Sequence, residues 1–426
     1  MAPAPTFAEI LARMLPRLAH WPELLTAFEH SFPNALTTSV SFPTPETTFV
    51  ITGDIQAMWL RDSTAQVWPY LHFLHQDAGL RRMFGGLIVQ QARCITLDPY
   101  ANAFNLEARG PGHPDQPPSH PLVWERKFEL DSLCYPIRLA HAYWRAGGDT
   151  AYLTGEFRSA ASLILKTLRC EQQHASHSLY RFHRPLPVLP TDNLPNGGLG
   201  QPVGVTGMIW SAFRPSDDAC TYNYNVPGNM MAAVELGHLA ELASELWAAP
   251  DLAHDALTLK TQIEAGIEEY GVVEHPIHGP LYAYETDGLG HHLLMDDANV
   301  PSLLSIPYLG YRPASDQAYQ NTRAFVLSPE NPYYVHGTYA QGVGSPHTPA
   351  GFVWPIALAM QGLTSGSETE VDGLLEMLVR SAAGTHLMHE SFDPDDPARF
   401  TREWFGWANS LFAELVLAHA GQPQPA

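Results

Sequence analysis

The chain has 426 residues, with 23 lysine and arginine residues against 44 aspartate and glutamate residues, and a formal net charge of −21. This acidic balance argues against nucleic acid or an anionic membrane surface as the main partner, because both require a cationic face on the protein. The hydrophobic fraction of 45% is typical of a globular chain that buries a large core.

The N-terminal segment predicts an amphipathic helix near residues 6–30. It lacks the apolar stretch and the small-residue cleavage site of a signal peptide. No window along the chain has the roughly 18 uninterrupted apolar residues of a membrane span. The cysteines are widely spaced, which favours free buried thiols over disulfides or a metal site; they are Cys94, Cys134, Cys170 and Cys220. These features favour a cytoplasmic setting.

Helical periodicity dominates the rest of the chain, with apolar residues recurring at i, i+3, i+4 and i+7. Strand signals are few and short. Clusters of proline and glycine between the periodic segments predict long ordered loops, as at 108–122 and 184–206. In chain order, we expect helices at 62–76, 79–95, 129–147, 151–173, 226–247, 252–269, 350–363, 367–383 and 401–420. We expect strands at 47–51, 180–182 and 281–284.

No composition shift or flexible linker divides the chain, which predicts one all-α domain over residues 1–426 with functional loops at one end. Twelve helices in six hairpins would need roughly 70 residues per hairpin, and the chain is long enough for that number. No clean repeat of that period is visible. Periodicity alone therefore does not establish a closed ring of hairpins.

Five loop segments place carboxylates beside tryptophan, tyrosine, arginine or asparagine at a helix start. Aromatic faces stack on the apolar faces of sugars, and carboxylate, arginine, asparagine and histidine side chains pair with hydroxyl groups. One such segment has little specificity, but five together favour a carbohydrate site. The segments are 54–70, 124–140, 213–230, 295–311, and 342–349 together with 388–409.

Hydrolysis of a glycosidic bond requires two carboxyl groups. One protonates the leaving oxygen, and the other activates water or attacks the anomeric carbon. The acid needs a raised pKa, which burial or a like-charged neighbour supplies. The candidates are the adjacent Asp217 and Asp218, together with Glu390 and Glu403. Asp217 or Asp218 could instead cap the next helix, although only at a distance.

Several candidates also have possible structural roles. Asp62 and Asp131 could cap the helices near which they lie, and Glu403 could stabilise the first turn of a helix through the helix dipole. His347 lies between two prolines, where a core position is hard to explain, so a bound hydroxyl group is favoured.

Motifs for other chemistries are missing from the sequence. Histidine pairs with metal-ligand spacing among acids, glycine-rich phosphate loops, dinucleotide fingerprints and the Gly-x-Ser-x-Gly nucleophile motif do not occur. We therefore expect neither a metal nor a cofactor.

The string DIQAMWLRDSTAQVWPY at 54–70 closely resembles the signature of glycoside hydrolase family 125, the metal-independent exo-α-1,6-mannosidases. The strings WERKFELDSLCYPI, RPSDDAC, MDDANVPSLLSIPYLGY, GSPHTP and TREWFGWAN resemble the other blocks of that family, in the same order. The resemblance runs from about residue 30 to 418, which is nearly the whole chain.

The resemblance implies an (α/α)6 barrel that hydrolyses terminal, non-reducing α-1,6-linked mannose with inversion and without a metal. It makes Asp217 the general acid, with Asp218 as the alternative one residue away, and Glu390 the general base, with Glu403 as the alternative. The partner would be a mannose-containing oligosaccharide. Further contacts to the sugar would come from Arg61, Asp62, His347, Trp124 and Asp131.

Other sugar-binding proteins remain alternatives. An epimerase would need a base beside a carbonyl, and a phosphorylase would need a cationic phosphate pocket, to which Arg61 and Arg402 could contribute. A non-catalytic carbohydrate-binding protein is a third alternative, against which the intact Asp/Glu pair argues. The natural mannoside, the number of positive subsites and the oligomeric state stay open.

Overall fold

The computed structural model describes residues 10, 12, 14, 16–108 and 112–421. Part of the helix expected at 6–30, namely residues 6–9, 11, 13 and 15, lies outside the described residues. The helices are α2 (Pro22–Ser31), α3 (Leu60–Ala65), α4 (Ala78–Leu97), α5 (Leu130–Arg145), α6 (Glu156–Glu171), α7 (His174–His177), α8 (Pro195–Gly198), α9 (Val226–Glu241), α10 (Pro250–Tyr270), α11 (Ile306–Leu309), α12 (Gln317–Val326), α13 (Pro355–Leu363), α14 (Glu368–Ser381) and α15 (Gly406–His419).

Most of the expected helices form, and where they differ the sequence gives a local reason. The helix expected at 62–76 divides into α3 and a 3-10 helix, Trp68–Gln76, because Pro69 has no N–H to continue the α-helical hydrogen bonds. The helix expected at 226–247 ends as α9 and widens into a π-helix, Leu242–Leu246. Further short helices lie at Ala35–Ser39 (π), Thr150–Leu153 (3-10) and Pro190–Asp192 (3-10).

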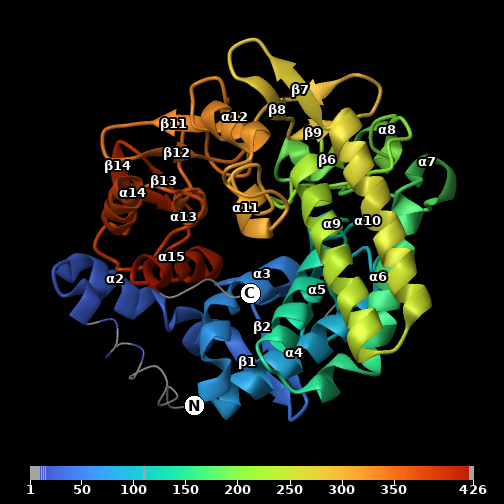
Figure 1. Cartoon of the computed structure of the whole chain (residues 1–426), viewed down its shortest axis with the longest axis horizontal. Helices are drawn as coiled ribbons and strands as arrows, with labels where there is room; N and C mark the ends of the chain where they lie inside the picture. Colours follow the sequence, from blue (N-terminus) through green and yellow to red (C-terminus); the bar gives the residue numbers. More distant parts are fainter. Residues whose placement is uncertain (1–9, 11, 13, 15, 109–111, 422–426) are drawn as a thin grey trace.

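Two kinds of helix differ in burial. The helices α5, α9, α13 and α15 are buried around nearly their whole circumference. The helices α6, α10, α12 and α14 bury one face only, as helices beside solvent do. Figure 1 shows the first set around the middle of the molecule, together with α3 and α11, and the second set outside them.

The helices contact one another in sequence around this middle. α3 packs against α5, α5 against α9 and α9 against α11. α13 packs against α15, and α15 packs back against α3 and α2, so the last helix meets the first ones. A hydrophobic core cluster runs through these contacts and includes residues from Ile10 to Leu417.

Short strands are more numerous than the sequence predicts, although helices dominate the described chain as expected. In the described residues they form six antiparallel sheets of two or three strands. The strands are β1 (Val40–Thr44), β2 (Thr47–Val50), β3 (Met58–Trp59), β4 (Ala103–Phe104), β5 (Val123–Glu125), β6 (Tyr224–Asn225), β7 (Val272–His275), β8 (Gly279–Tyr282), β9 (Glu285–Thr286), β10 (His292–Leu293), β11 (Tyr334–His336), β12 (Gln341–Val343), β13 (Ser391–Asp393) and β14 (Asp396–Thr401).

The three expected strands have different outcomes. The first is β2, and the third overlaps β8. The segment 180–182 forms no strand; only His183 beside it makes an isolated bridge, to Gln116. Most of the unexpected strands have two to four residues, which is too short for an alternating pattern to stand out from the sequence.

The small sheets lead the chain into the buried helices. β3 runs directly into α3, β6 into α9, and the β13–β14 hairpin precedes α15. The helix expected at 401–420 begins only at Gly406 because β14 extends to Thr401. The loops that join strand to helix therefore gather near the starts of the buried helices.

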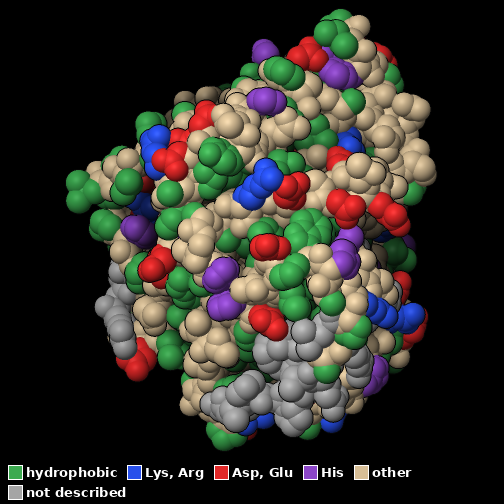
Figure 2. Space-filling view, turned by 90° about the vertical axis from the view of Figure 1, so that its left-hand side faces the viewer, with side chains coloured by type: hydrophobic (Ala, Val, Ile, Leu, Met, Phe, Trp, Pro, Cys, Tyr) green, Lys and Arg blue, Asp and Glu red, His purple; other side chains and the backbone are tan. Residues whose placement is uncertain are grey.

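The sequence also made predictions about membrane-spanning helices, cysteine pairing and surface charge. None of the helices in the described part of the chain combines the length and apolar character that a membrane crossing requires. All four cysteines are free, and Cys94, Cys134 and Cys220 are buried. On the face shown in Figure 2, acidic side chains are scattered widely, and the described lysine and arginine side chains lie apart from one another.

Candidate active site

A cavity with about 510 Å³ of empty space opens beside the starts of α3, α13 and α15. Aromatic rings form part of its wall: Trp59, Trp354, Phe405 and Trp407. Charged side chains from five separate segments complete it: Arg61, Asp62, Asp217, His347, Glu390 and Arg402. Such a mixture of ring faces and hydrogen-bonding groups suits a sugar.

Arg61 is the centre of the polar network at this cavity. It lies in the first turn of α3, and its side chain is 3% exposed. Its Nη1 donates to Glu129 Oε2 (2.6 Å) and Asp131 Oδ2 (3.0 Å), and its Nη2 donates to Asp217 Oδ1 (3.3 Å). Asp62 Oδ2 lies 3.6 Å from Nε. One buried guanidinium thus faces four carboxyl groups.

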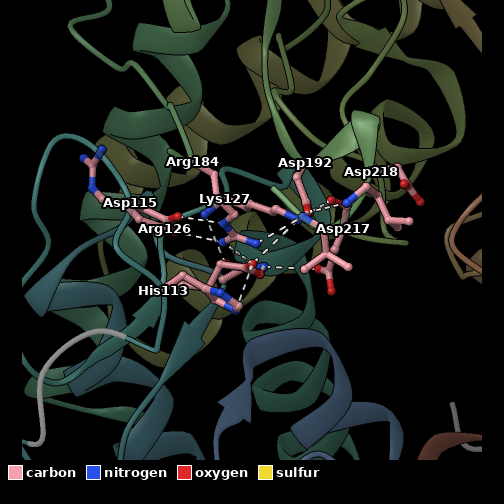
Figure 3. Close-up of polar contacts among 12 residues, drawn as sticks. His113, Asp115, Arg126, Lys127, Arg184, Asp192, Asp217 and Asp218 are labelled. Carbon is pink, nitrogen blue, oxygen red and sulfur yellow. Dashed lines mark hydrogen bonds and ion pairs between the residues drawn. The ribbon is translucent and has the colours of Figure 1, made fainter. Parts of the chain in front are cut away.

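Asp217 is held from several sides. Its φ of +66° lies in the left-handed region, which is uncommon for a residue other than glycine. Lys127 Nζ donates to the Asp217 backbone carbonyl (2.7 Å) and to Asp192 Oδ1 (3.0 Å). Figure 3 shows Lys127 between Asp192, Asp217 and the neighbouring Arg184. Arg184 in turn donates two hydrogen bonds to Asp115, at 2.8 and 2.9 Å.

The expectation of a raised pKa for the acid is not met at Asp217 in the free protein. Burial favours the protonated form, but a hydrogen bond from Glu129 and the charges of Arg61 and Lys127 outweigh it, so the pKa of Asp217 is lowered. Burial raises the pKa of Glu129 well above its ordinary value, and the nearby Asp217 raises it further. The pKa values of these two neighbouring carboxyl groups are therefore shifted in opposite directions.

Asp218 points away from the cavity. Its side chain is 1% exposed, and it is not among the described residues of the cavity wall. Thr191 Oγ1 donates to its Oδ1, and His347 Nδ1 lies 3.4 Å from its Oδ2. Burial opposes the charged form of His347, but Asp218 and the charge of Asp217 raise its pKa to about 9. His347 therefore faces the cavity as an imidazolium ion at neutral pH.

Glu390 and Glu403 also have different surroundings. Glu390 lies immediately before β13, lines the cavity and is 13% exposed, with Arg402 Nη1 3.5 Å from its Oε1. Arg402, which has a φ of +52°, also donates to the Thr52 carbonyl and pairs with Asp54. Glu403 is exposed and does not line the cavity.

The other expected contacts are placed as follows. Asp62 lines the cavity, and burial raises its pKa to about 6. Asp131 is buried behind Arg61 and does not line the cavity. The N-cap positions of α3 and α5 are Trp59 and Glu129, so neither aspartate has the capping role that the sequence left open. Trp124 packs beside the cluster of Ala57, Trp59 and Ala103 rather than at the cavity wall.

Sequence reasoning missed several residues of the site. Glu129 and Asn102 contact Asp217 or its partners from below the cavity wall, and Asn299 lines it. Glu129 lies in the segment 124–140, which the sequence predicted to belong to the site because it is rich in acidic and aromatic residues. The sequence did not single out Glu129 within that segment. Nothing in the sequence around Asn102 marks it, because an isolated asparagine is common in loops.

Outside the cavity, His275, His278 and Glu330 lie close enough together to be considered as possible metal ligands. His278 Nε2 lies 2.5 Å from Glu330 Oε2, and His275 Nε2 lies 4.0 Å from Glu330 Oε1. The backbone N–H groups of Ile277 and His278 both donate to His275 Nδ1 (3.3 Å). These bonds place the ring proton of neutral His275 on Nε2, the atom that lies 4.0 Å from Glu330 Oε1.

Carboxyl groups from separate segments, in a cavity walled by aromatic rings on a helical scaffold, are features that a glycoside hydrolase requires. The chain belongs to the family of metal-independent α-mannosidases, glycoside hydrolase family 125, whose model matches residues 22–417. The family predicted from the sequence motifs is therefore confirmed, and the protein is an α-mannosidase.

Known proteins with similar sequences or structures support this membership. A solved metal-independent α-mannosidase of Streptococcus pneumoniae, in a non-productive complex with α-1,6-mannobiose, is 45% identical, covers 98% of each chain and has a TM-score of 0.96. The meiotically up-regulated gene 157 protein of Schizosaccharomyces pombe is 42% identical over 419 residues, which are 93% of this chain and 82% of that protein. A glucoamylase from Saccharomycopsis fibuligera is 11% identical with a TM-score of 0.61, over 93% of this chain and 94% of that chain, and shows the fold alone.

Proposed function

We propose that the protein removes terminal, non-reducing α-1,6-linked mannose from a mannose-containing oligosaccharide, with inversion at the anomeric carbon and without a metal. The linkage is supported by the α-1,6-mannobiose bound to the S. pneumoniae enzyme, which shares 45% of its residues with this chain. The reaction type is supported by the family of metal-independent α-mannosidases.

Asp217 is the proposed general acid and Glu390 the proposed general base. In an inverting hydrolase, the acid protonates the leaving oxygen while the base removes a proton from the water that attacks the opposite face of the sugar. The observation that carries these roles is that Asp217 and Glu390 both line the cavity, whereas their alternatives Asp218 and Glu403 do not.

Three polar side chains at the wall are the proposed sugar ligands. Arg61, Asp62 and His347 all face the cavity, and a charged donor or acceptor forms strong hydrogen bonds with hydroxyl groups. Asp131 is proposed to act through Arg61, since it bonds that side chain from behind.

We further propose that residues 1–426 form one domain, an (α/α)6 barrel. The support is the alternation of fully buried helices with helices that bury one face, and the contact of α15 with α3 that brings the chain's ends together. The four free thiols support a reducing compartment as the place of action, because disulfides are rare there.

An NMR time course with α-1,6-mannobiose and EDTA-treated protein tests the reaction. We expect β-mannose as the first product, because attack from the face opposite the leaving group inverts the anomeric centre. Initial α-mannose would mean retention and would remove the base role from Glu390. Dependence of product formation on phosphate would indicate a phosphorylase instead.

A further inference from the structure

Four carboxyl groups surround the Arg61 guanidinium, and Lys127 and His347 add positive charge near Asp217. Four acids lie within 3.6 Å of one guanidinium group that is 3% exposed. Buried carboxylates without a matching charge take up protons, because burial disfavours the ionised form. Burial thus favours a proton on at least one of these four acids.

Glu129 and Asp217 accept hydrogen bonds from the same amide nitrogen and from the same guanidinium group. Asn102 Nδ2 donates to Glu129 Oε1 (3.1 Å) and to Asp217 Oδ1 (3.2 Å). Arg61 offers Nη1 to Glu129 and Nη2 to Asp217. Two carboxyl groups that share an amide nitrogen and a guanidinium group disfavour each other's ionisation, which raises the pKa of one of them.

We propose that Glu129 and Asp217 hold one proton between them, and that Glu129 returns this proton to Asp217 for delivery to the leaving oxygen. The inference rests on the proposed function, in which Asp217 is the acid. Glu129 has a side chain with 0% exposure and does not line the cavity, so it acts through Asp217 as a positioning residue.

The proton balance of one turnover is complete. The proton moves from Glu129 to Asp217 and from Asp217 to the glycosidic oxygen as the bond from that oxygen to the anomeric carbon breaks. Glu390 takes a proton from the attacking water as its oxygen bonds to that carbon. Glu390 then releases this proton to solvent, and the Glu129–Asp217 pair takes one back from solvent.

The surroundings decide on which member the proton rests in the free protein. Positive groups favour an ionised Asp217, whereas complete burial and the negative neighbour favour a protonated Glu129, in line with the lowered pKa of the first and the raised pKa of the second. The surroundings of Asp217 favour its ionised form, but the protonated Glu129 beside it can supply a proton at neutral pH. The charged and titratable groups that face the pair are Arg61, Asp62, Lys127, Asp131 and His347, together with Glu125, whose Oε2 accepts from the same Asn102 nitrogen at 3.0 Å.

The test is the pH profile of kcat/KM for Glu129→Gln. The alkaline limb reports loss of the proton from the acid in the free enzyme. Without the negative partner, Asp217 ionises more easily, so we expect the limb for α-1,6-mannobiose to move down by about one pH unit or more, with a roughly tenfold lower rate at neutral pH for each unit. A dinitrophenyl α-mannoside, whose leaving group needs little protonation, should lose less than about threefold.

Matched controls separate a proton role from a structural one. Asp131→Asn removes a carboxylate from the same Arg61 atom but shares no amide with Asp217, so its alkaline limb should move less than that of Glu129→Gln. An unshifted limb in Glu129→Gln, or equal losses on both substrates, would overturn the proton-sharing role. If the unaltered protein hydrolysed no α-mannoside, the proposed function itself would fail instead.

A spectroscopic measurement keeps the proposal testable if Glu129→Gln does not fold. The infrared carbonyl band of protonated carboxyl groups is recorded for the unaltered protein and for Asp217→Asn at neutral pH. Removing the charge of Asp217 lowers the pKa of Glu129, so the variant should lose the absorbance of one protonated carboxyl. Identical bands in the two proteins would contradict a shared proton.

Discussion

Asp217 and Asp218 are neighbours in the chain with opposite surroundings. The left-handed backbone at Asp217 turns its side chain into the cavity, while Asp218 faces Thr191 and His347 behind the wall. Lys127 holds the Asp217 carbonyl and thereby the turn. Adjacent acids in a sequence thus carry separate tasks because the backbone conformation sends them to different places.

Asp217→Asn tests the acid role at the residue scale. An amide cannot protonate the leaving oxygen, so we expect kcat on α-1,6-mannobiose to fall about 10²- to 10⁴-fold. Hydrolysis of a dinitrophenyl α-mannoside should fall far less, since its leaving group departs without a proton. Equal losses on the two substrates, measured by steady-state kinetics, would move the acid role elsewhere.

Glu390→Gln tests the base role. The amide keeps the shape of the side chain but does not accept the proton of water, so turnover should fall about 10²- to 10⁴-fold while α-1,6-mannobiose still binds. Calorimetric titration measures the binding and product release measures the turnover. Glu403→Gln is the matched control: its exposed side chain lies outside the cavity wall, and activity should stay near that of the unaltered protein.

At the scale of the element, the close contact of α4 with β2 depends on a missing side chain. A Cβ on Gly86 in α4 would lie 2.6 Å from Thr48 Oγ1 and 2.9 Å from Thr48 N, which is backbone. The strand cannot yield at a backbone atom without moving. Gly373 in α14 has no atom within 4 Å of the corresponding position.

Alanine at these two glycines should therefore have opposite effects. Gly86→Ala forces β2 away from α4 and should lower the free energy of unfolding by about 1–3 kcal/mol. Gly373→Ala meets open space and restricts the unfolded chain, so it should raise that free energy by about 0.4–1 kcal/mol. Denaturant midpoints at unchanged slope give both values. A stabilising Gly86→Ala would contradict the close α4–β2 contact.

For the whole molecule, buried titratable groups make stability depend on pH. Burial raises the pKa of Glu414 to about 7 and that of Asp296 to about 8, although two backbone N–H groups bond Asp296. When folding raises the pKa of an acid, the acid ionises at a lower pH in the unfolded chain than in the folded one. Its contribution to stability is therefore complete below about pH 4 and is lost as pH rises through the folded pKa. His347, with a pKa of about 9, loses its contribution over the range from about 6.5 to 9.

The melting temperature should thus fall as pH rises from about 6.5 to 9, above the range in which the buried His72, His141 and His389 titrate. Glu414→Gln removes one of the titrations, because the amide fills the same buried place beside Tyr308 without ionising. Between pH 5 and 8 the unaltered protein should lose about 2–3 kcal/mol more stability than this variant. Parallel pH curves of melting temperature for the two proteins would show that Glu414 does not titrate as expected.

The positions of most helices followed from the sequence, because their apolar periodicity extends over many residues and is set locally by 3.6 residues per turn. The family and the block that contains each site segment followed too, since they depend on strings of neighbouring residues. Short strands such as β3 and β4 could not be predicted from the sequence, because a two-residue strand is defined only by its hydrogen bonds to a partner strand.

The sequence by itself determined the helical class, the enzyme family and the group of acids from which the proposed catalytic pair comes. Only the tertiary structure decided that Asp217 rather than Asp218 faces the cavity, that Glu390 rather than Glu403 joins it, and that Glu129 lies against Asp217. The physical reason is that burial, charge and proton sharing depend on distances between segments far apart in the chain. Arg61 meets Asp217 across 156 positions, and no local pattern contains that contact.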